Sequence, residues 1–244
     1  MENSVGYKKY FATFAEKQSD MKQILSTLAL IAVCLQAMAQ NPESTASIYV
    51  KAGIGSRLGK AGGDTELDRQ HSQKLSKGYS LQLELVLNSP SLITTGVIVN
   101  DFHSSATDKV VVTYTNGSKE SGDMVDVADI WLFAPATYIK GSTLGDKLSF
   151  FWGVGVGPMG LRDKGSILDY AVIKSGWCLG GVTEVGLNYA LSPAFSIGFS
   201  TNLAVGNLTS YKTKELSTGN VQKTTNVSET ISHIDLLLSV SYAF

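Results

Sequence analysis

The sequence predicts an all-β fold, an eight-stranded antiparallel up-and-down β-barrel that crosses a membrane with its strands. Apolar and polar residues alternate with a period of two in segment after segment, which is typical of strands with two unlike faces. Short connections rich in Gly, Pro and Ser alternate with long polar ones. Only 17% of the 244 residues are charged and the formal net charge is −1, so we expect no nucleic-acid partner.

The N-terminal residues are expected to direct export and to stay outside the barrel. An apolar run at 24–35 follows a basic start and is too short to span a bilayer comfortably. It ends in an A-x-A pattern typical of secretory signal peptides, which predicts cleavage between Ala39 and Gln40. The predicted division is a mis-assigned extension at 1–20, a signal peptide at 21–39 and a barrel domain at 40–244.

Eight alternating segments account for the barrel. In chain order they are 48–55, 79–88, 93–99, 130–138, 148–157, 177–189, 195–206 and 235–244. In the fourth segment we assign the series from Ile130 to Tyr138 to the apolar face, although Trp131 and Phe133 interrupt the opposite face. The other segments separate an apolar series from Gly, Ser, Asn and a few charged residues.

The connections are predicted to be short and long in turn. Tight turns are expected at 88–91, 140–143 and 191–194, and long polar loops at 56–77, 103–123, 161–175 and 207–228. The second long loop contains Val110 to Thr115, a run of β formers, followed by the hairpin signal Asn116-Gly117. This loop is therefore either a β-ribbon above the membrane or a flexible loop with some strand content.

Alternation alone does not say which face points outward, because a soluble lipocalin-like barrel has its apolar face inside. Here the second face consists of small and polar residues, which suits the crowded interior of a narrow barrel. Aromatic residues near the strand ends predict two belts at the bilayer interfaces. The predicted belt residues are Tyr79, Tyr138, Phe150, Trp177, Tyr189 and Phe195.

In the last nine residues, 236–244, an apolar series alternates with Leu237, Ser239, Ser241 and Ala243, and the segment ends on an aromatic residue. They resemble the C-terminal strand of bacterial outer-membrane barrels, and the strand count and loop pattern resemble the OmpX/OmpA-type small barrels. The resemblance implies the outer membrane of a Gram-negative-type bacterium, with short periplasmic turns and long extracellular loops. It also implies contact with outer-membrane lipid and lipopolysaccharide, and a signal for the barrel-assembly machinery formed by Leu238, Val240, Tyr242 and Phe244.

Charged residues on the predicted inner face form the expected interior cluster. They are Lys51, Glu84, Asp129, Glu184 and Asp235. Lys51 and Glu84 lie at similar heights on neighbouring antiparallel strands, so we expect them to pair, because an unpaired buried charge is costly. Continuous filling by side chains makes a wide pore unexpected.

No cofactor or metal is expected. The stretch 155–160 reads G-x-G-x-x-G, but Pro158 and the alternating context argue against the helix that a dinucleotide site needs. The three histidines, His71, His103 and His233, lack metal-ligand spacing.

The predicted function is a structural or surface-interaction barrel, without enzymatic activity, whose loops contact an extracellular partner. One alternative is a small-solute conduit. The other is a lipid-active enzyme: His103 and Ser105 form an H-x-S pattern similar to that of outer-membrane lipid A deacylases, and this would place a His-activated Ser near the outer leaflet. Ala106 departs from that family's pattern, which has Asn at this position.

Overall fold

A computed structural model describes residues 45–59, 65–88, 92–141 and 147–244. The predicted extension, the signal peptide and the cleavage site between Ala39 and Gln40 lie outside the described residues. Among the described residues, no helix is long and apolar enough to cross a membrane.

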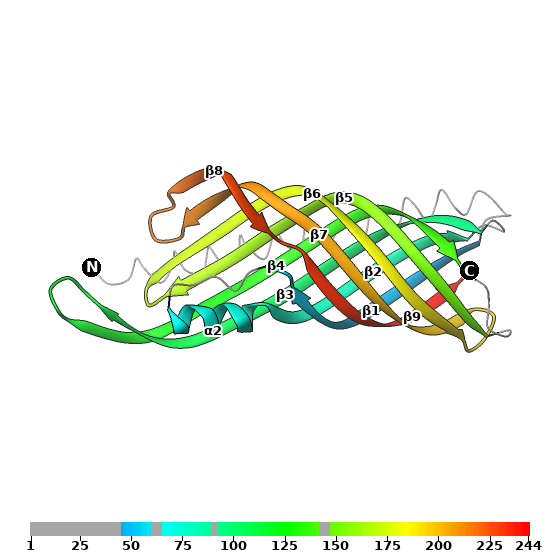
Figure 1. The fold of residues 1–244 in the computed structure, drawn as a ribbon, viewed down its shortest axis with the longest axis horizontal. Helices are drawn as coiled ribbons and strands as arrows, with labels where there is room; N and C mark the ends of the chain where they lie inside the picture. The colour runs from blue at the N-terminus through cyan, green and yellow to red at the C-terminus, as the bar shows by residue number, and fades with distance from the viewer. Residues whose placement is uncertain (1–44, 60–64, 89–91, 142–146) are drawn as a thin grey trace, which may run out of the picture. The chain divides into compact units, whose positions relative to one another are not determined.

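One antiparallel sheet contains all nine strands of the described chain, and eight of them form a closed ring (Figure 1). The ring is closed where β1 pairs with β9, from Ser47↔Ala243 to Arg57↔His233. This confirms the predicted all-β fold and the strand number of the barrel. The elements are β1 (Thr45–Arg57), α2 (Glu66–Leu75), β2 (Lys77–Asn88), β3 (Ile93–Thr113), β4 (Lys119–Lys140), β5 (Leu148–Ile167), β6 (Tyr170–Ala190), β7 (Phe195–Glu215), β8 (Val221–Thr230) and β9 (His233–Ala243).

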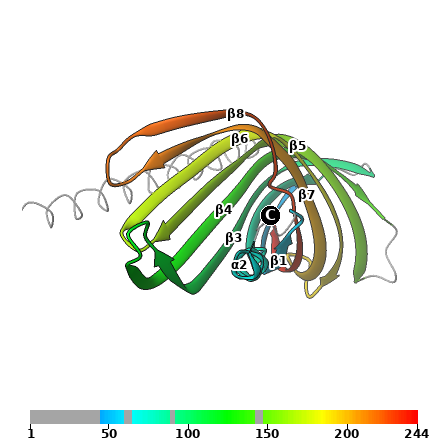
Figure 2. The same cartoon turned by 60° about the vertical axis from the view of Figure 1, so that its left-hand side comes forward.

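The strands fall into two length classes. β1, β2 and β9 have 13, 12 and 11 residues, whereas β3 to β7 have 20 to 22. A tilted strand crosses a bilayer with about 9–11 residues, so the long strands continue well beyond it. Together with β8 they form a tall extracellular wall on one side of the ring (Figures 1 and 2). The shorter strands β9, β1 and β2 do not extend into this wall.

Three of the predicted long loops are largely strands in the structure. β3 and β4 stay paired as far as Thr113↔Lys119, which confirms the ribbon alternative for 103–123. β5 and β6 stay paired as far as Ile167↔Tyr170. The prediction of a loop at 161–175 is therefore wrong, because this region is a β-hairpin. The region 207–228 holds the end of β7 and most of β8. In each case the strand lies outside the membrane and has polar residues on both faces. The apolar–polar alternation is therefore missing, and the sequence was interpreted as a loop.

The remaining long connection contains α2, which the alternation analysis missed. Thr65 caps the helix: its Oγ1 accepts from the backbone N–H of Asp68, and the Asp68 side chain accepts from Thr65 N–H. This capping box satisfies backbone donors that the first turn leaves free. The acidic first turn and Lys74 in the last turn also suit the helix dipole.

The faces of the ring alternate as predicted on seven strands. Apolar side chains such as Val50, Leu81, Leu179 and Leu238 are exposed on the outside of the ring. Such a continuous apolar exterior would be costly in water and is suited to lipid. β4 is the exception.

The prediction for β4 is wrong, because its apolar series from Ile130 to Tyr138 points into the barrel. Tyr138 is 3% exposed and Ile130 is fully buried, so Tyr138 belongs to no belt. Trp131 and Phe133 take the outer face instead. Both faces of β4 are apolar because its inner side packs in the hydrophobic part of the core, and alternation therefore could not separate them.

Candidate functional site

The centre of the barrel holds a buried ionic cluster around Lys51. Lys51 Nζ lies 2.6 Å from Glu84 Oε1 and also contacts Glu184 Oε1, which reaches across the ring from β6. Gln82 Nε2 donates to both carboxylates, at 2.8 Å to Glu184 Oε2. The Phe151 ring lies 5.0 Å from the ammonium. All four polar side chains are 1–2% exposed, so a charge here depends on its partners.

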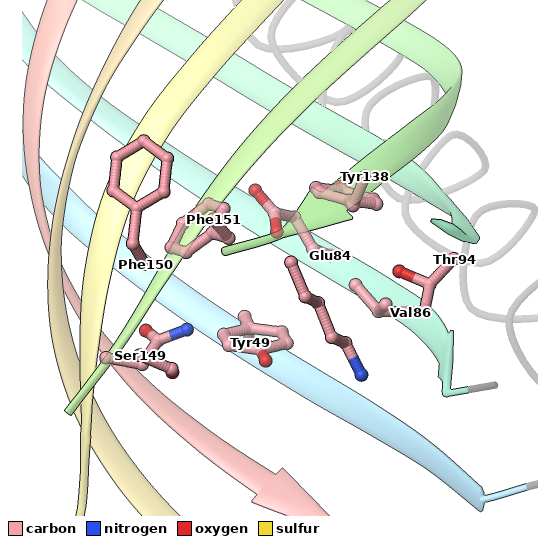
Figure 3. A pocket seen from close by; sticks show the side chains of 10 residues that line it. Tyr49, Glu84, Val86, Thr94, Tyr138, Ser149, Phe150 and Phe151 are labelled. Atoms are coloured by element: carbon pink, nitrogen blue, oxygen red, sulfur yellow. The ribbon is translucent and has the colours of Figure 1, made fainter. Parts of the chain in front are cut away.

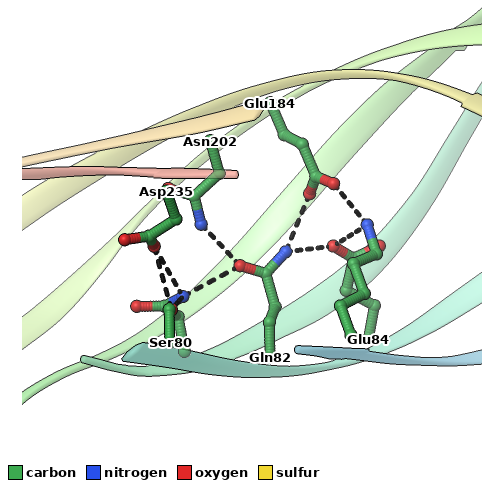
Figure 4. Close-up of polar contacts among 8 residues, drawn as sticks. Ser80, Gln82, Glu84, Glu184, Asn202 and Asp235 are labelled. Atoms are coloured by element: carbon green, nitrogen blue, oxygen red, sulfur yellow. Dashed lines mark hydrogen bonds and ion pairs between the residues drawn. The ribbon is translucent and has the colours of Figure 1, made fainter. Parts of the chain in front are cut away.

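A second group of polar side chains continues from this cluster toward the extracellular end (Figure 4). Asn100 Nδ2 donates to Gln82 Oε1 at 3.0 Å and to Ser80 Oγ at 2.9 Å. Ser80 Oγ donates to Asp235 Oδ2 at 2.9 Å. His233 Nε2 lies 3.0 Å from Asn100 Oδ1 and closes the upper end.

This network fills the polar half of the interior, and an apolar core fills the other half. The amides of Gln82 and Asn100 stand between the ionic cluster and Asp235, and amides do not take up and release protons near neutral pH. The network is therefore a poor proton path. The apolar core includes Ile98, Phe102, Ile130, Leu132, Met159 and Leu161.

The structure brings together four of the five predicted interior charges in this network: Lys51, Glu84, Glu184 and Asp235. Asp129 is not among them, and its predicted interior position is wrong. The reason is that the inward and outward faces of β4 were assigned the wrong way round. It lies on the outer face, where Asp129 Oδ1 accepts from His103 Nδ1 at 2.6 Å. The amides and His233 were missed because they carry no net charge, although their alternating positions on inward faces could have identified them.

The outer face near the end of the apolar band combines polar groups with aromatic rings. The His103 ring lies 4.8 Å from the Tyr79 ring, and Trp131 packs edge-on against Trp177. Ser105 is exposed two residues after His103 on the same face, but among the described residues no hydrogen bond joins the two. His103 is thus oriented by the carboxylate of Asp129, but in the described structure it makes no hydrogen bond to the Ser105 hydroxyl.

The other predicted aromatic residues lie on the exterior. Tyr79, Phe150, Trp177, Tyr189 and Phe195 are all exposed. The predicted assembly residues Leu238, Val240, Tyr242 and Phe244 also face outward on the last strand, which ends with Phe244 N–H donating to Ala46 O. Tyr242 packs against Phe195 with the ring centroids 5.0 Å apart.

The extracellular wall carries a different polar cluster on its inner face, where α2 docks. His71 places its two ring nitrogens 2.8 Å from carboxylate oxygens of Asp108 on β3 and Asp126 on β4. Lys74 adds an ion pair to Asp108. Hydrogen bonds from Lys74 and then His71 hold the pKa of Asp108 below its ordinary value. We call these four side chains the helix clamp.

The wall also presents free strand edges. Among the described residues, β2 pairs with β3 only as far as Gly78↔Ser104, so β3 continues from Ser105 to Thr113 with β4 alone as neighbour. β8 likewise pairs with β7 alone. Within the described part of the chain, no three acidic, His or Cys side chains gather in a way that could hold a metal ion.

Solved structures share this architecture at low sequence identity. A major outer membrane protein from Thermus thermophilus superposes with a TM-score of 0.53 at 17% identity, covering 82% of this chain and 99% of that one. The attachment invasion locus protein Ail of Yersinia pestis, solved with the heparin analogue sucrose octasulfate, gives 0.47 at 13%, covering 83% and 99%. Neisserial surface protein A gives 0.43 at 10%, covering 82% and 96%.

A scan of family models and a search of curated proteins gave no match. The likeness to the Thermus protein shows the fold of a small β-barrel, and the apolar exterior is suited to lipid, as the resemblance of the strand pattern implied.

Proposed function

We propose that this outer-membrane β-barrel is a surface-interaction protein, in which a plugged barrel anchors a rigid extracellular wall that binds a partner. The observation that carries the proposal is the β3–β4 ribbon, which pairs without interruption from Ile93↔Ile139 to Thr113↔Lys119. That is roughly twice the strand length needed to cross a bilayer. A ribbon of this length presents a fixed surface well above the lipid.

The free edge of β3 suggests how a partner binds. In the part of the chain that the structure describes, no strand pairs with the free edge of β3 between Ser105 and Thr113, and Val111 is exposed. An exposed edge pairs readily with an extended segment of another protein through main-chain hydrogen bonds. The partner is therefore a protein with an extended segment. The buried ionic cluster and the packed apolar core argue against the alternative of a solute conduit.

The test replaces residues 110–120 by a short turn and measures adhesion of expressing cells to immobilised matrix and serum proteins. We expect adhesion to fall to the level of cells lacking the protein, while the heat-dependent gel shift of the folded barrel stays. The matched control shortens the hairpin tip between β7 and β8, 216–220, and keeps adhesion. Equal adhesion with and without the ribbon would contradict the proposal.

A lipid-active enzyme is the second candidate, and the bond between His103 Nδ1 and Asp129 Oδ1 favours it. A carboxylate that orients a histidine beside an exposed Ser105 supplies three groups that an ester hydrolase uses. Their place on the outer face would suit an acyl chain of lipopolysaccharide. The missing bond between Ser105 and His103, and Ala106 in place of Asn, weigh against this candidate.

Mass spectrometry of lipid A separates the two candidates. Cells with the wild-type protein, with His103→Ala, with Ser105→Ala or with no protein are compared. For an interaction protein we expect the same acyl chains in all four. A missing acyl chain that depends on both His103 and Ser105 would establish the enzyme, because a hydroxyl without its base is a weak nucleophile.

A further inference from the structure

Charged groups inside the barrel and on the outside of the extracellular wall differ in how they are compensated. Glu84 lines a cavity of about 170 Å³ at the short-turn end (Figure 3) and is paired with Lys51. Outside, a group of exposed lysines lies on β5, β7 and β8, strands that with β6 form one side of the wall (Figure 2). We call this group the lysine face; its members are Lys164, Lys212, Lys214 and Lys223.

Strand pairing places all four lysines on the outward side. Trp177 on β6 faces outward and is 58% exposed, and Ser175 and Ile173 lie two and four residues from it on the same face. β5 and β6 stay in register through this region. Residues that pair across strands share a face, so the lysines that pair with these positions also face outward. The connecting pairs are Lys164↔Ile173, Ile173↔Lys214, Ser175↔Lys212 and Lys212↔Lys223.

This arrangement of lysines is unfavourable without an anionic partner. Lys212 and Lys223 lie directly opposite each other on neighbouring strands, where like charges destabilise a sheet. On the inner side of the same part of the wall, Lys174 is paired with Glu229. In the part of the chain that the structure describes, the four lysines of the lysine face make no ion pair. Anionic groups from outside the protein would remove the repulsion.

The acidic residues of these strands lie on the opposite side. Asp163, Glu215 and Glu229 occupy inward positions on β5, β7 and β8. On the neighbouring strand β4, Asp129 does face outward, but its carboxylate accepts from His103. Among the described strand positions of β5 to β8 in the wall, the outward side therefore carries lysines and no carboxylate.

The lysine face begins next to the aromatic end of the apolar exterior. Ser175, which pairs with Lys212, is two residues from Trp177, and two strand residues span about 7 Å. Trp131 packs against Trp177 at the same level. Aromatic residues of this kind mark the interface between hydrocarbon and headgroups. The ammonium groups of Lys212 and Lys223 thus lie at the height at which lipid phosphates are found.

We propose that the lysine face binds the phosphate groups of lipid headgroups in the leaflet next to the extracellular wall. A lysine ammonium binds phosphate as a point charge and requires no fixed orientation. One phosphate between Lys212 and Lys223 would compensate both charges, while the acyl chains lie along the apolar exterior below Trp177. This surface is separate from the free edge of β3, so the inference does not depend on the proposed protein partner.

The test measures binding of lipid A to the full barrel in detergent micelles by native mass spectrometry, and compares it with the same lipid after enzymatic removal of its phosphates. We expect the phosphorylated lipid to bind at least fivefold more tightly. The preference should shrink as salt is added, because salt screens exposed charges. The double variant Lys212→Gln, Lys223→Gln should lose most of the preference and bind the dephosphorylated lipid as the wild type does.

The matched control is the double variant Lys109→Gln, Lys119→Gln. It removes the same charge from exposed positions of the β3–β4 ribbon and should keep the preference for phosphate. Equal affinity of the wild type for both lipids overturns the proposal, and so does an equal loss in the two double variants. Inositol hexakisphosphate that binds as tightly as lipid A overturns it as well, because the partner would then be a soluble polyanion. The heat-dependent gel shift checks that each variant is folded, and the comparison of the two lipids needs no variant.

Discussion

The barrel body and the extracellular wall use the same alternating strands in different surroundings. Val50 in the body and Val111 in the wall are 59% and 63% exposed, yet one faces lipid and the other water. Lys51 in the body is buried among carboxylates, whereas Lys109 in the wall forms an exposed pair with Asp123. The exposed fraction of a side chain therefore does not by itself determine its contribution to stability. The surrounding medium, lipid or water, determines the free energy of placing a charge or a methyl group there.

The largest effect is expected from removing the ammonium of the ionic cluster. Lys51→Met leaves Glu84 and Glu184 facing each other without a cation, and breaking a buried ion pair in this way costs about 3–5 kcal/mol. Glu84→Gln should cost less, because Lys51 keeps Glu184 as a partner. Urea unfolding of the barrel in lipid vesicles, followed by tryptophan fluorescence, measures both changes.

The same substitution in the wall is the control for the comparison. Lys109→Met removes an exposed pair, which is worth at most about 1 kcal/mol. A Lys51→Met variant as stable as Lys109→Met would mean that water reaches the interior cluster and that the barrel is not plugged.

A charge on each outward valine tests the boundary between lipid and water. Val50→Arg places a guanidinium on the lipid-facing side, where a charge near the midplane costs about 2–4 kcal/mol. Val111→Arg should change the free energy of unfolding by less than about 0.5 kcal/mol, as surface changes usually do. The same unfolding experiment compares the two, and equal costs would show that the wall also lies in the membrane.

Sequence alternation predicted the body well where the two faces differ in chemistry. In β9, Leu236, Leu238 and Val240 alternate with Ser239 and Ser241, so the two faces are clearly separated in the sequence. On β4 both faces are apolar, and the assignment failed there for a physical reason: half of this barrel's interior is hydrophobic. A residue of β4 can join the polar network only if it lies on the inward face. Because that face was assigned wrongly, Asp129 was wrongly placed in the network.

The sites were less predictable than the strands. Neighbouring strands suggested that Lys51 and Glu84 meet, but Glu184 joins them from across the ring, and that contact depends on how the barrel closes. The helix was signalled by Thr65 and Asp68 at capping positions. It was overlooked because α2 is mostly polar and docks through His71 rather than through an apolar stripe.

The helix clamp should make the wall sensitive to acid. Because the pKa of Asp108 is lowered when α2 is docked, the clamp stabilises docking above the ordinary carboxylate range and loses this stabilisation as the pH falls through the lowered value. Hydrogen exchange of the α2 amides, measured from neutral to strongly acidic pH, should show protection lost at the acid end. His71, Lys74 and Asp126 are the other ionisable groups of the clamp.

Asp108→Asn should lower α2 protection already at neutral pH and remove the acid transition that depends on this carboxyl. Asp123→Asn, on the outer face of the same ribbon, is the matched control and should leave the α2 protection unchanged. A transition that persists unaltered in Asp108→Asn would place the acid sensitivity elsewhere.

The smallest effect on the barrel body is expected from a change at the tip of the β3–β4 ribbon, where Gly117 has φ of +84°. An L-residue in this left-handed region costs roughly 1–2 kcal/mol, although no atom lies within 4 Å to clash with an added Cβ. Gly117→Ala should therefore loosen the ribbon through backbone strain alone. Hydrogen exchange should speed up severalfold between Val111 and Glu120, while the urea midpoint of the barrel stays unchanged. A shift of that midpoint would show that wall and body unfold as one unit, and the separation of the molecule into two independently stable regions would have to be given up.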